Sequence, residues 1–143
     1  MDKRGQFARV LGIATVLCEA LPIMTIHEPA VPALSVWIAL ESPTHHVPGV
    51  NGMIDLVARE VAGLPIAVER IAGRDGLGDS LLLRAGVDNG EKAAALMSHL
   101  DTVHPVGTSA SDLPVRVEGD RLYGPGVYDM KGGAWLALQA FKD

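Results

Sequence analysis

The chain has 143 residues, of which 48% are hydrophobic and 20% are charged, and its formal net charge is −5. These values are ordinary for a folded protein with a real core, and they exclude global disorder. Acidic and basic residues are interspersed, so the sequence offers neither the basic surface that nucleic acid requires nor a polybasic membrane patch, and we expect no partner of either kind.

Residues 1–23 differ from the rest of the chain. A basic start and the short apolar run Val10–Leu17 resemble the opening of a signal peptide, but Glu19 interrupts the run and no clear cleavage site follows. The run is also too short to span a bilayer. We interpret residues 1–23 as an N-terminal extension. Cys18 is the single cysteine, which excludes an intramolecular disulfide and a cysteine-based zinc site and favours a cytoplasmic location.

Two helices are expected next. Residues 32–41 carry apolar side chains at helical spacing, and Pro32 is tolerated in a first turn. Ser42 precedes a proline and therefore ends this helix. Residues 50–64 give the clearest helical pattern, because their apolar residues step by four, three, four and three along one face. These residues are Val50, Ile54, Val57, Val61 and Leu64.

Strands are expected after the second helix. Ile66–Ile71 and Ser80–Ala85 are bounded by turn residues. The run at the start of Ala93–Leu100 is apolar at every position, which is typical of a strand buried on both faces in the middle of an α/β sheet. Leu113–Val117 and Arg121–Tyr123 flank a turn and predict a small hairpin.

A final helix is predicted from about Lys131 onward, and we interpret Trp37, Trp135 and Phe141 as core residues. The succession of helices, strands and a last helix indicates an α/β fold. Because the chain stops on this last helix, the pattern is typical of a fragment.

His99 and Asp101 form the first chemical motif. Side chains two residues apart on a strand point to the same face, so both would project from the C-terminal end of the predicted central strand, where open α/β sheets bind ligands. A metal-bound histidine usually donates its other ring N–H to a carboxylate or a carbonyl, and Asp101 is placed for that role. A hydrogen-bonded surface pair is the alternative.

The second motif is a glycine-framed turn, Gly124-Pro125-Gly126, which is followed by Asp129 and by Lys131-Gly132-Gly133. Glycine permits backbone conformations that a Cβ forbids, and proline stiffens the turn. A phosphate-binding loop is a poor fit, because the spacing matches no phosphate motif and the aspartate would repel the ligand. A tight turn with a capping aspartate remains the structural alternative.

Residues 97–105 and 117–133 together resemble the N-terminal catalytic region of the zinc metallopeptidase family of glutamate carboxypeptidases, acetylornithine deacetylases and succinyl-diaminopimelate desuccinylases. The glutamate carboxypeptidase branch is the most similar, and residues 41–45 resemble the segment that precedes this region. The similarity runs from about Pro32 to the last residue. It implies that residues 24–143 are a truncated, N-terminal part of a zinc exopeptidase catalytic domain with a mixed sheet and flanking helices.

The resemblance also implies a site. In this family two zinc ions share one bridging aspartate, which maps onto Asp129, while His99 maps onto a ligand of one zinc and Asp101 onto its partner in catalysis. A cis peptide bond would follow at Asp129–Met130. His104 is interpreted as a loop contact rather than a ligand, and His46 as a solvated or capping residue.

The implied reaction is hydrolysis of a C-terminal peptide bond or an N-acyl amino-acid amide bond, which makes the whole protein a metallopeptidase and hydrolase. Family members are often homodimers. The general base and the remaining zinc ligands of the family lie further downstream, so this chain is expected to be inactive alone. Two alternatives stay open: an inactive remnant or partner-binding fragment, and a deacylase of N-acyl amino acids.

Overall fold

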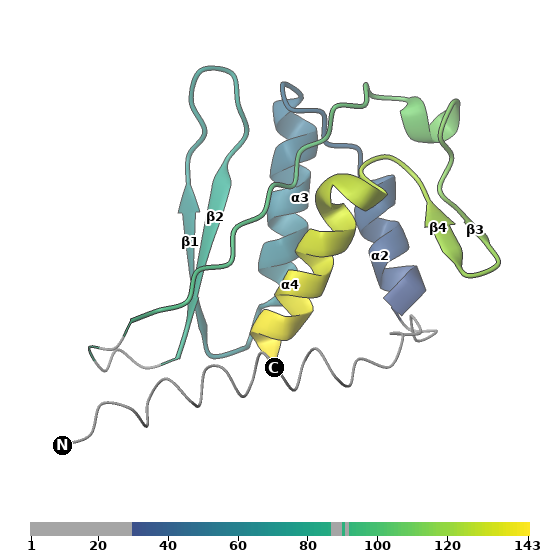
Figure 1. Cartoon of the computed structure of the whole chain (residues 1–143). Helices are drawn as coiled ribbons and strands as arrows, with labels where there is room; N and C mark the ends of the chain where they lie inside the picture. The colour runs from purple at the N-terminus through teal and green to yellow at the C-terminus, as the bar shows by residue number, and fades with distance from the viewer. Residues whose placement is uncertain (1–29, 87–89, 91) are drawn as a thin grey trace.

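The computed structural model describes residues 30–86, 90 and 92–143. Residues 1–23, including the single cysteine, lie outside the described residues, and so does the interpretation given to them. The described part mixes helices with small antiparallel sheets, which confirms the α/β class in this coarse sense (Figure 1). The helices are α2 (Ala30–Ala39), α3 (Val47–Glu60) and α4 (Gly132–Lys142), and the strands are β1 (Ile66–Ile71), β2 (Ser80–Ala85), β3 (Arg116–Glu118) and β4 (Arg121–Tyr123).

The core lies where the three helices meet. Apolar residues spaced by three or four positions line the inner face of each helix, as the periodicity of α2 and α3 predicts. The cluster is formed by Leu34, Trp37, Ile38, Met53, Val57, Val61, Ala134 and Leu138. Trp37 is fully buried, as predicted, whereas Trp135 and Phe141 are only half-buried. Both N-terminal helices start and end two to four residues earlier than the sequence pattern predicts.

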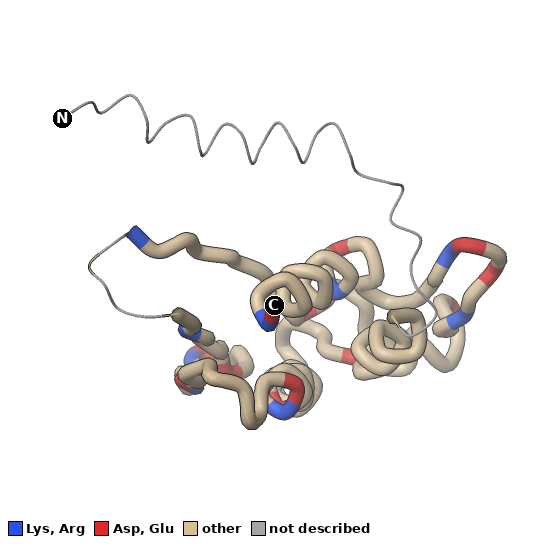
Figure 2. The backbone as a smooth tube through the Cα atoms, turned by 90° about the horizontal axis from the view of Figure 1, so that it is seen from below, with Lys and Arg blue, Asp and Glu red and all other residues tan. Residues whose placement is uncertain are grey.

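Two antiparallel hairpins flank the helices. β1 pairs with β2 in the register Ile66↔Ala85 to Ile71↔Ser80, and β3 pairs with β4. Figure 1 shows the first hairpin beside α3 and the second beyond α2. Acidic and basic residues are scattered among uncharged ones along the tube in Figure 2, and Arg84 and Glu69 form one of the exposed ion pairs. No helix in the described residues combines the length and the apolar character needed to cross a bilayer.

The predicted central strand Ala93–Leu100 is wrong. This stretch is extended but makes no ladder, and the side chains of Leu96 and Met97 are 66% and 91% exposed. The stretch contains no lysine, arginine, aspartate or glutamate. An apolar run signals burial, but a strand also needs neighbouring strands to accept its backbone hydrogen bonds. No strand in the described part of the chain lies beside this one, so the mixed sheet does not form.

Candidate metal centre

Residues 42–44, which were expected to end a helix, hold the segment that carries His99 and Asp101. The Thr102 N–H donates to Ser42 O at 2.8 Å, and the Thr44 N–H donates to Thr102 O at 3.1 Å. The Ser42 hydroxyl donates to Leu100 O at 2.7 Å. Ser42 and Thr102 are both buried. This short parallel contact replaces the missing sheet and fixes the residues on either side of Leu100.

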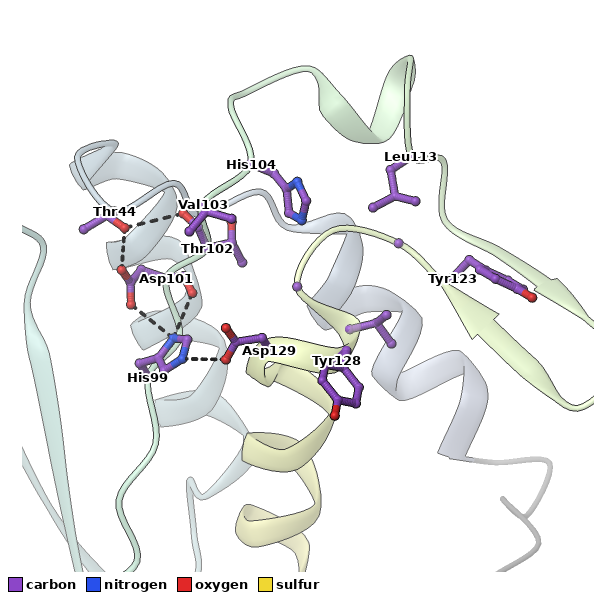
Figure 3. A pocket seen from close by; sticks show the side chains of 13 residues that line it. Thr44, His99, Asp101, Thr102, Val103, His104, Leu113, Tyr123, Tyr128 and Asp129 are labelled. Carbon is purple, nitrogen blue, oxygen red and sulfur yellow. Dashed lines mark hydrogen bonds and ion pairs between the residues drawn. The ribbon is translucent and has the colours of Figure 1, made fainter.

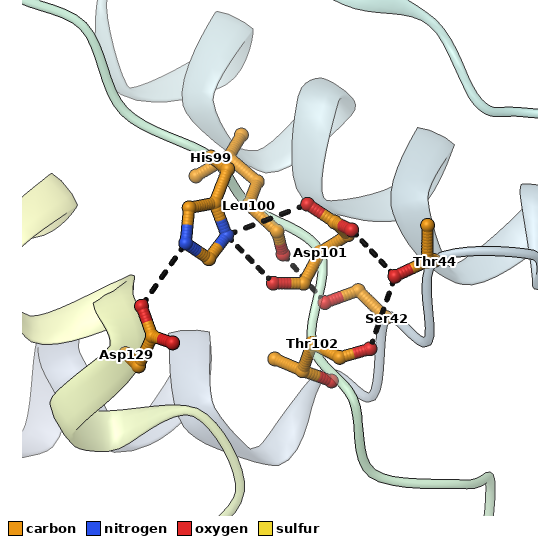
Figure 4. A network of polar contacts seen from close by, with 7 residues as sticks. All are labelled: Ser42, Thr44, His99, Leu100, Asp101, Thr102 and Asp129. Atoms are coloured by element: carbon orange, nitrogen blue, oxygen red, sulfur yellow. Dashed lines mark hydrogen bonds and ion pairs between the residues drawn. The ribbon is translucent and has the colours of Figure 1, made fainter.

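The His99 ring lies between two carboxylates (Figure 4). Its Nδ1 is 3.1 Å from the backbone oxygen of Asp101 and 3.4 Å from Asp101 Oδ1. Its Nε2 is 3.1 Å from Asp129 Oδ1. The Thr44 hydroxyl donates to Asp101 Oδ2 at 2.6 Å and restrains that carboxylate. The structure thus brings together all three residues that the two sequence motifs single out.

The environment of His99 favours a protonated ring. Burial lowers the pKa of the ring, but the hydrogen bond to the Asp101 backbone, the hydrogen bond to Asp129 and the negative charges of both aspartates outweigh it, so the pKa is raised. Two acceptors on opposite ring nitrogens stabilise an imidazolium because both nitrogens then donate. The same attraction would favour a metal cation in place of the proton on Nε2.

The turn that presents Asp129 depends on Gly126. Gly126 has φ 72°, and a Cβ at this position would collide with the side-chain methyl group of the buried Thr102. Glycine therefore allows the turn of residues 124–131 to rest directly on the segment that follows Asp101. The peptide bond Asp129–Met130 is cis, as the resemblance implies. The Asp129 side chain is 79% exposed and reaches over the pocket toward His99.

Lys131 anchors the other end of this turn. Its side chain is fully buried, and its ammonium group donates to Trp37 O at 3.1 Å and to Leu40 O at 2.6 Å. Burial lowers the pKa of Lys131 to about 8. The acceptors are carbonyls at the C-terminal end of α2, which lack helical partners and attract a cation. Sequence reasoning missed this contact, because its acceptors are backbone groups 91 and 94 residues away.

Glu41 holds the loop above the pocket. Its carboxylate accepts hydrogen bonds from Gly107 N at 2.6 Å and from Ser109 N and Oγ at 2.7 Å each. The backbone N–H of Gly107, followed by the two donors of Ser109, lowers the pKa of Glu41. Glu41 was expected at the end of a helix, and its role in holding this loop was not predictable, since its donors lie more than 60 residues away.

A pocket of about 310 Å³ opens beside the His99–Asp129 pair (Figure 3). The loop after Thr102 and the turn before Asp129 form its walls. His104 lines the pocket from the loop that follows Thr102, and its interpretation as a loop contact rather than a ligand stays a prediction. His46 occupies the N-cap position of α3, but its side chain makes no capping hydrogen bond and its Nδ1 is buried without a partner. The expectation of a capping residue is met in position, since the His46 backbone oxygen accepts from Gly49 N and Val50 N, but not by a side-chain hydrogen bond.

The described residues contain no group of three or more histidine, cysteine, aspartate or glutamate side chains placed to hold one metal ion. What they contain is the pair His99 and Asp129, in direct contact, with Asp101 behind the ring.

Known proteins are similar to this chain in the segment that carries the candidate site. Residues 95–143, which include both motifs, match the model of peptidase family M20/M25/M40. The chain is also similar to carboxypeptidase G2 of Pseudomonas sp. (strain RS-16), with 36% identity over 121 residues. The resemblance to the M20 peptidase family is confirmed over this segment. The aligned region is 82% of this chain and 28% of that relative, so the chain spans little more than a quarter of the curated relative it matches.

Proposed function

We propose that this chain supplies part of the metal centre of a zinc-dependent peptidase, with His99 and Asp129 as zinc ligands. The observation that carries the proposal is the 3.1 Å approach of His99 Nε2 to Asp129 Oδ1 at the edge of the pocket. An imidazole and a carboxylate, which are both common kinds of zinc ligand, meet there from positions 30 residues apart, and their segment matches a peptidase family.

The donor set fits zinc in kind. Imidazole nitrogen and carboxylate oxygen are both common zinc ligands, and the second oxygen of Asp129 leaves it able to bridge two ions. The set falls short in number, because a catalytic zinc ion takes about three protein ligands and the described residues bring only two together. We therefore propose that the chain alone binds zinc weakly and does not turn over substrate.

The surrounding residues orient these two ligands. Asp101 accepts on the Nδ1 side of His99, so that Nε2 faces Asp129, and the Thr44 hydroxyl holds Asp101 in that position. Lys131 ties the turn of Asp129 to α2. A zinc pair, when bound, would lower the pKa of a water and polarise the substrate carbonyl. Such orientation by hydrogen-bonded partners is what a metal site needs from the groups behind its ligands.

For the whole protein we propose hydrolysis of a C-terminal peptide bond or an N-acyl amino-acid amide bond, with release of glutamate or a related residue, by a cytoplasmic and homodimeric enzyme. The family match and the carboxypeptidase relative support the reaction type. Deacylation of N-acyl amino acids is the neighbouring alternative, and a substrate panel on a longer polypeptide separates the two.

A second candidate is an inactive remnant or a partner-binding fragment. The short ligand set among the described residues and the 28% coverage of the relative favour it for this chain taken alone. Zinc titration distinguishes the candidates: weak zinc binding that His99→Ala and Asp129→Ala abolish supports the metal-centre role, whereas a chain that binds no zinc is a remnant.

Zinc titration of the purified chain tests the ligand assignment. Complete zinc sites bind with about 10–16 kcal/mol, so half a ligand set should give about 5–8 kcal/mol, or a Kd of about 1 µM to 0.2 mM. His99→Ala and Asp129→Ala should each abolish this binding, measured by competition with a chromophoric chelator. His104→Ala is the matched control, since His104 lines the same pocket but is not proposed as a ligand. Unchanged affinity in Asp129→Ala would reject the assignment.

A further inference from the structure

The pocket beside the metal ligands has walls of a distinct chemical kind. Away from His99 and the two aspartates it is lined mostly by apolar groups, which include Val103, Leu113 and Val127. Figure 3 shows Leu113 and His104 extending from the upper loop toward the turn that carries Asp129. Val103 is 90% exposed, so its methyl groups are available to a ligand.

Fixed positive charge is absent from this lining among the described residues. Lys131 is buried and points to the carbonyls of α2. Arg116 lies over the ring of Tyr123, 4.3 Å from its centroid, but does not line the pocket, and its guanidinium pairs with Glu118 at 2.6 Å. An imidazole such as His104 does not carry the permanent charge of lysine or arginine. Among the described residues, the pocket lining therefore offers a free carboxylate no lysine or arginine partner.

A substrate with a C-terminal carboxylate has two sides relative to the bond that is cut. The amino-acid side carries the negative charge, and the acyl side does not have to. Because the walls beside the proposed ligands are mostly apolar, the acyl side, which need not carry a charge, is the one that fits. An apolar cavity of about 150 Å³ is large enough to bind benzene. A pocket of about 310 Å³ can accommodate a branched acyl group together with its carbonyl.

We propose that this pocket is the acyl subsite and that it selects a branched, apolar acyl group, such as isovaleryl or a peptide residue of similar shape. The proposal rests on the proposed function for the position of the reacting carbonyl. Val103 and Leu113 are the specificity-determining residues, because they supply apolar contacts in the pocket. Neither takes part in the hydrogen bonds of His99, which are made with Asp101 and Asp129.

Binding of matched N-acyl glutamates tests the proposal on the whole 143-residue chain. N-isovaleryl-, N-acetyl- and N-succinyl-L-glutamate share the same amino acid, so its carboxylates cancel in the ratio of their Kd values. Methyl NMR titrations are made without zinc and again with zinc. Isovaleryl adds three carbons to acetyl, and half-efficient burial of these carbons gives about tenfold tighter binding. The acidic succinyl compound should bind least well.

Two variants test whether the pocket residues cause the preference for the isovaleryl group. Val103→Ser should cut the isovaleryl-to-acetyl ratio by about threefold, since it removes one of the apolar contacts. Val106→Ser is the control, because Val106 belongs to the same loop and is 58% exposed but does not line the pocket, and its ratio should equal that of the unmodified chain. Leu113→Ser gives a second, independent reduction.

Equal affinity for the isovaleryl and acetyl compounds, preference for succinyl, absence of binding by all three, or an equal loss in Val106→Ser would each overturn the proposal. The outcome is separable from that of the zinc titration. An acyl preference without zinc binding leaves an apolar site and removes the metallopeptidase role. Zinc binding without an acyl preference leaves the proposed function standing and removes this subsite.

Discussion

Replacing Gly126 by alanine tests whether the contact between the two motif segments holds the site together. Gly126 has φ 72°, in the left-handed region that costs a residue with a Cβ about 1–2 kcal/mol. The new methyl group would also collide with the buried side chain of Thr102, and overpacking of this kind costs about 1–3 kcal/mol. We therefore expect Gly126→Ala to lower the free energy of unfolding by about 2–5 kcal/mol.

Gly119→Ala is the matched control. Gly119 has φ 61°, yet a Cβ there would meet no atom within 4 Å, so this variant carries the backbone cost alone, about 1–2 kcal/mol. Urea unfolding followed by far-UV circular dichroism gives both values. With a slope of about 1–3 kcal/mol/M, the excess of Gly126→Ala over the control corresponds to a midpoint lower by about 1 M.

The functional consequence follows from geometry. Gly126 rests on Thr102, which follows Asp101, so a methyl group between them pushes the turn of Asp129 away from His99. Zinc affinity should fall in Gly126→Ala and stay unchanged in Gly119→Ala. Equal destabilisation by the two substitutions would refute the steric reasoning, and full zinc affinity in Gly126→Ala would refute its link to the site.

Three further outcomes are expected. Thr44→Val removes the 2.6 Å hydrogen bond to Asp101 and should weaken zinc binding by about tenfold, with recovery in Thr44→Ser; a valine variant that titrates like the unmodified chain contradicts this role. Hydrogen bonds from Gly107 and then Ser109 lower the pKa of Glu41 below its ordinary value of 4.5. The stability that the ionised Glu41 side chain adds to the folded state is therefore fully present above pH 4.5 and is lost as the pH falls through the lowered pKa. In acid titrations, Glu41→Gln should therefore be less stable than the unmodified chain at neutral pH and approach it at low pH, and a constant difference argues against the linkage. Met53→Ala creates a cavity at a fully buried position and should cost about 2–5 kcal/mol in urea unfolding, against a negligible change for the exposed Met97→Ala.

The helices were predictable because their signal is local. Residues 50–64 carry an apolar stripe at helical spacing, and the stripe alone specifies which face is buried. The strand predicted at 93–100 failed for the opposite reason, since its ladder depends on other strands that the described residues do not place beside it. The hairpin of β3 and β4 lies between these cases, because its partner is only a turn away.

The sequence by itself determined the chemistry of the candidate site: an imidazole, two carboxylates and a glycine-framed turn, in an order that resembles a peptidase family. Only the tertiary structure decided that His99 and Asp129 meet, because the contact needs residues 42–44 to hold one segment and Lys131 to fasten the other to α2. These supports are hydrogen bonds to backbone groups, which every residue carries. Nothing in the identity of the accepting residues reveals such a contact, so it becomes visible only when the chain is folded.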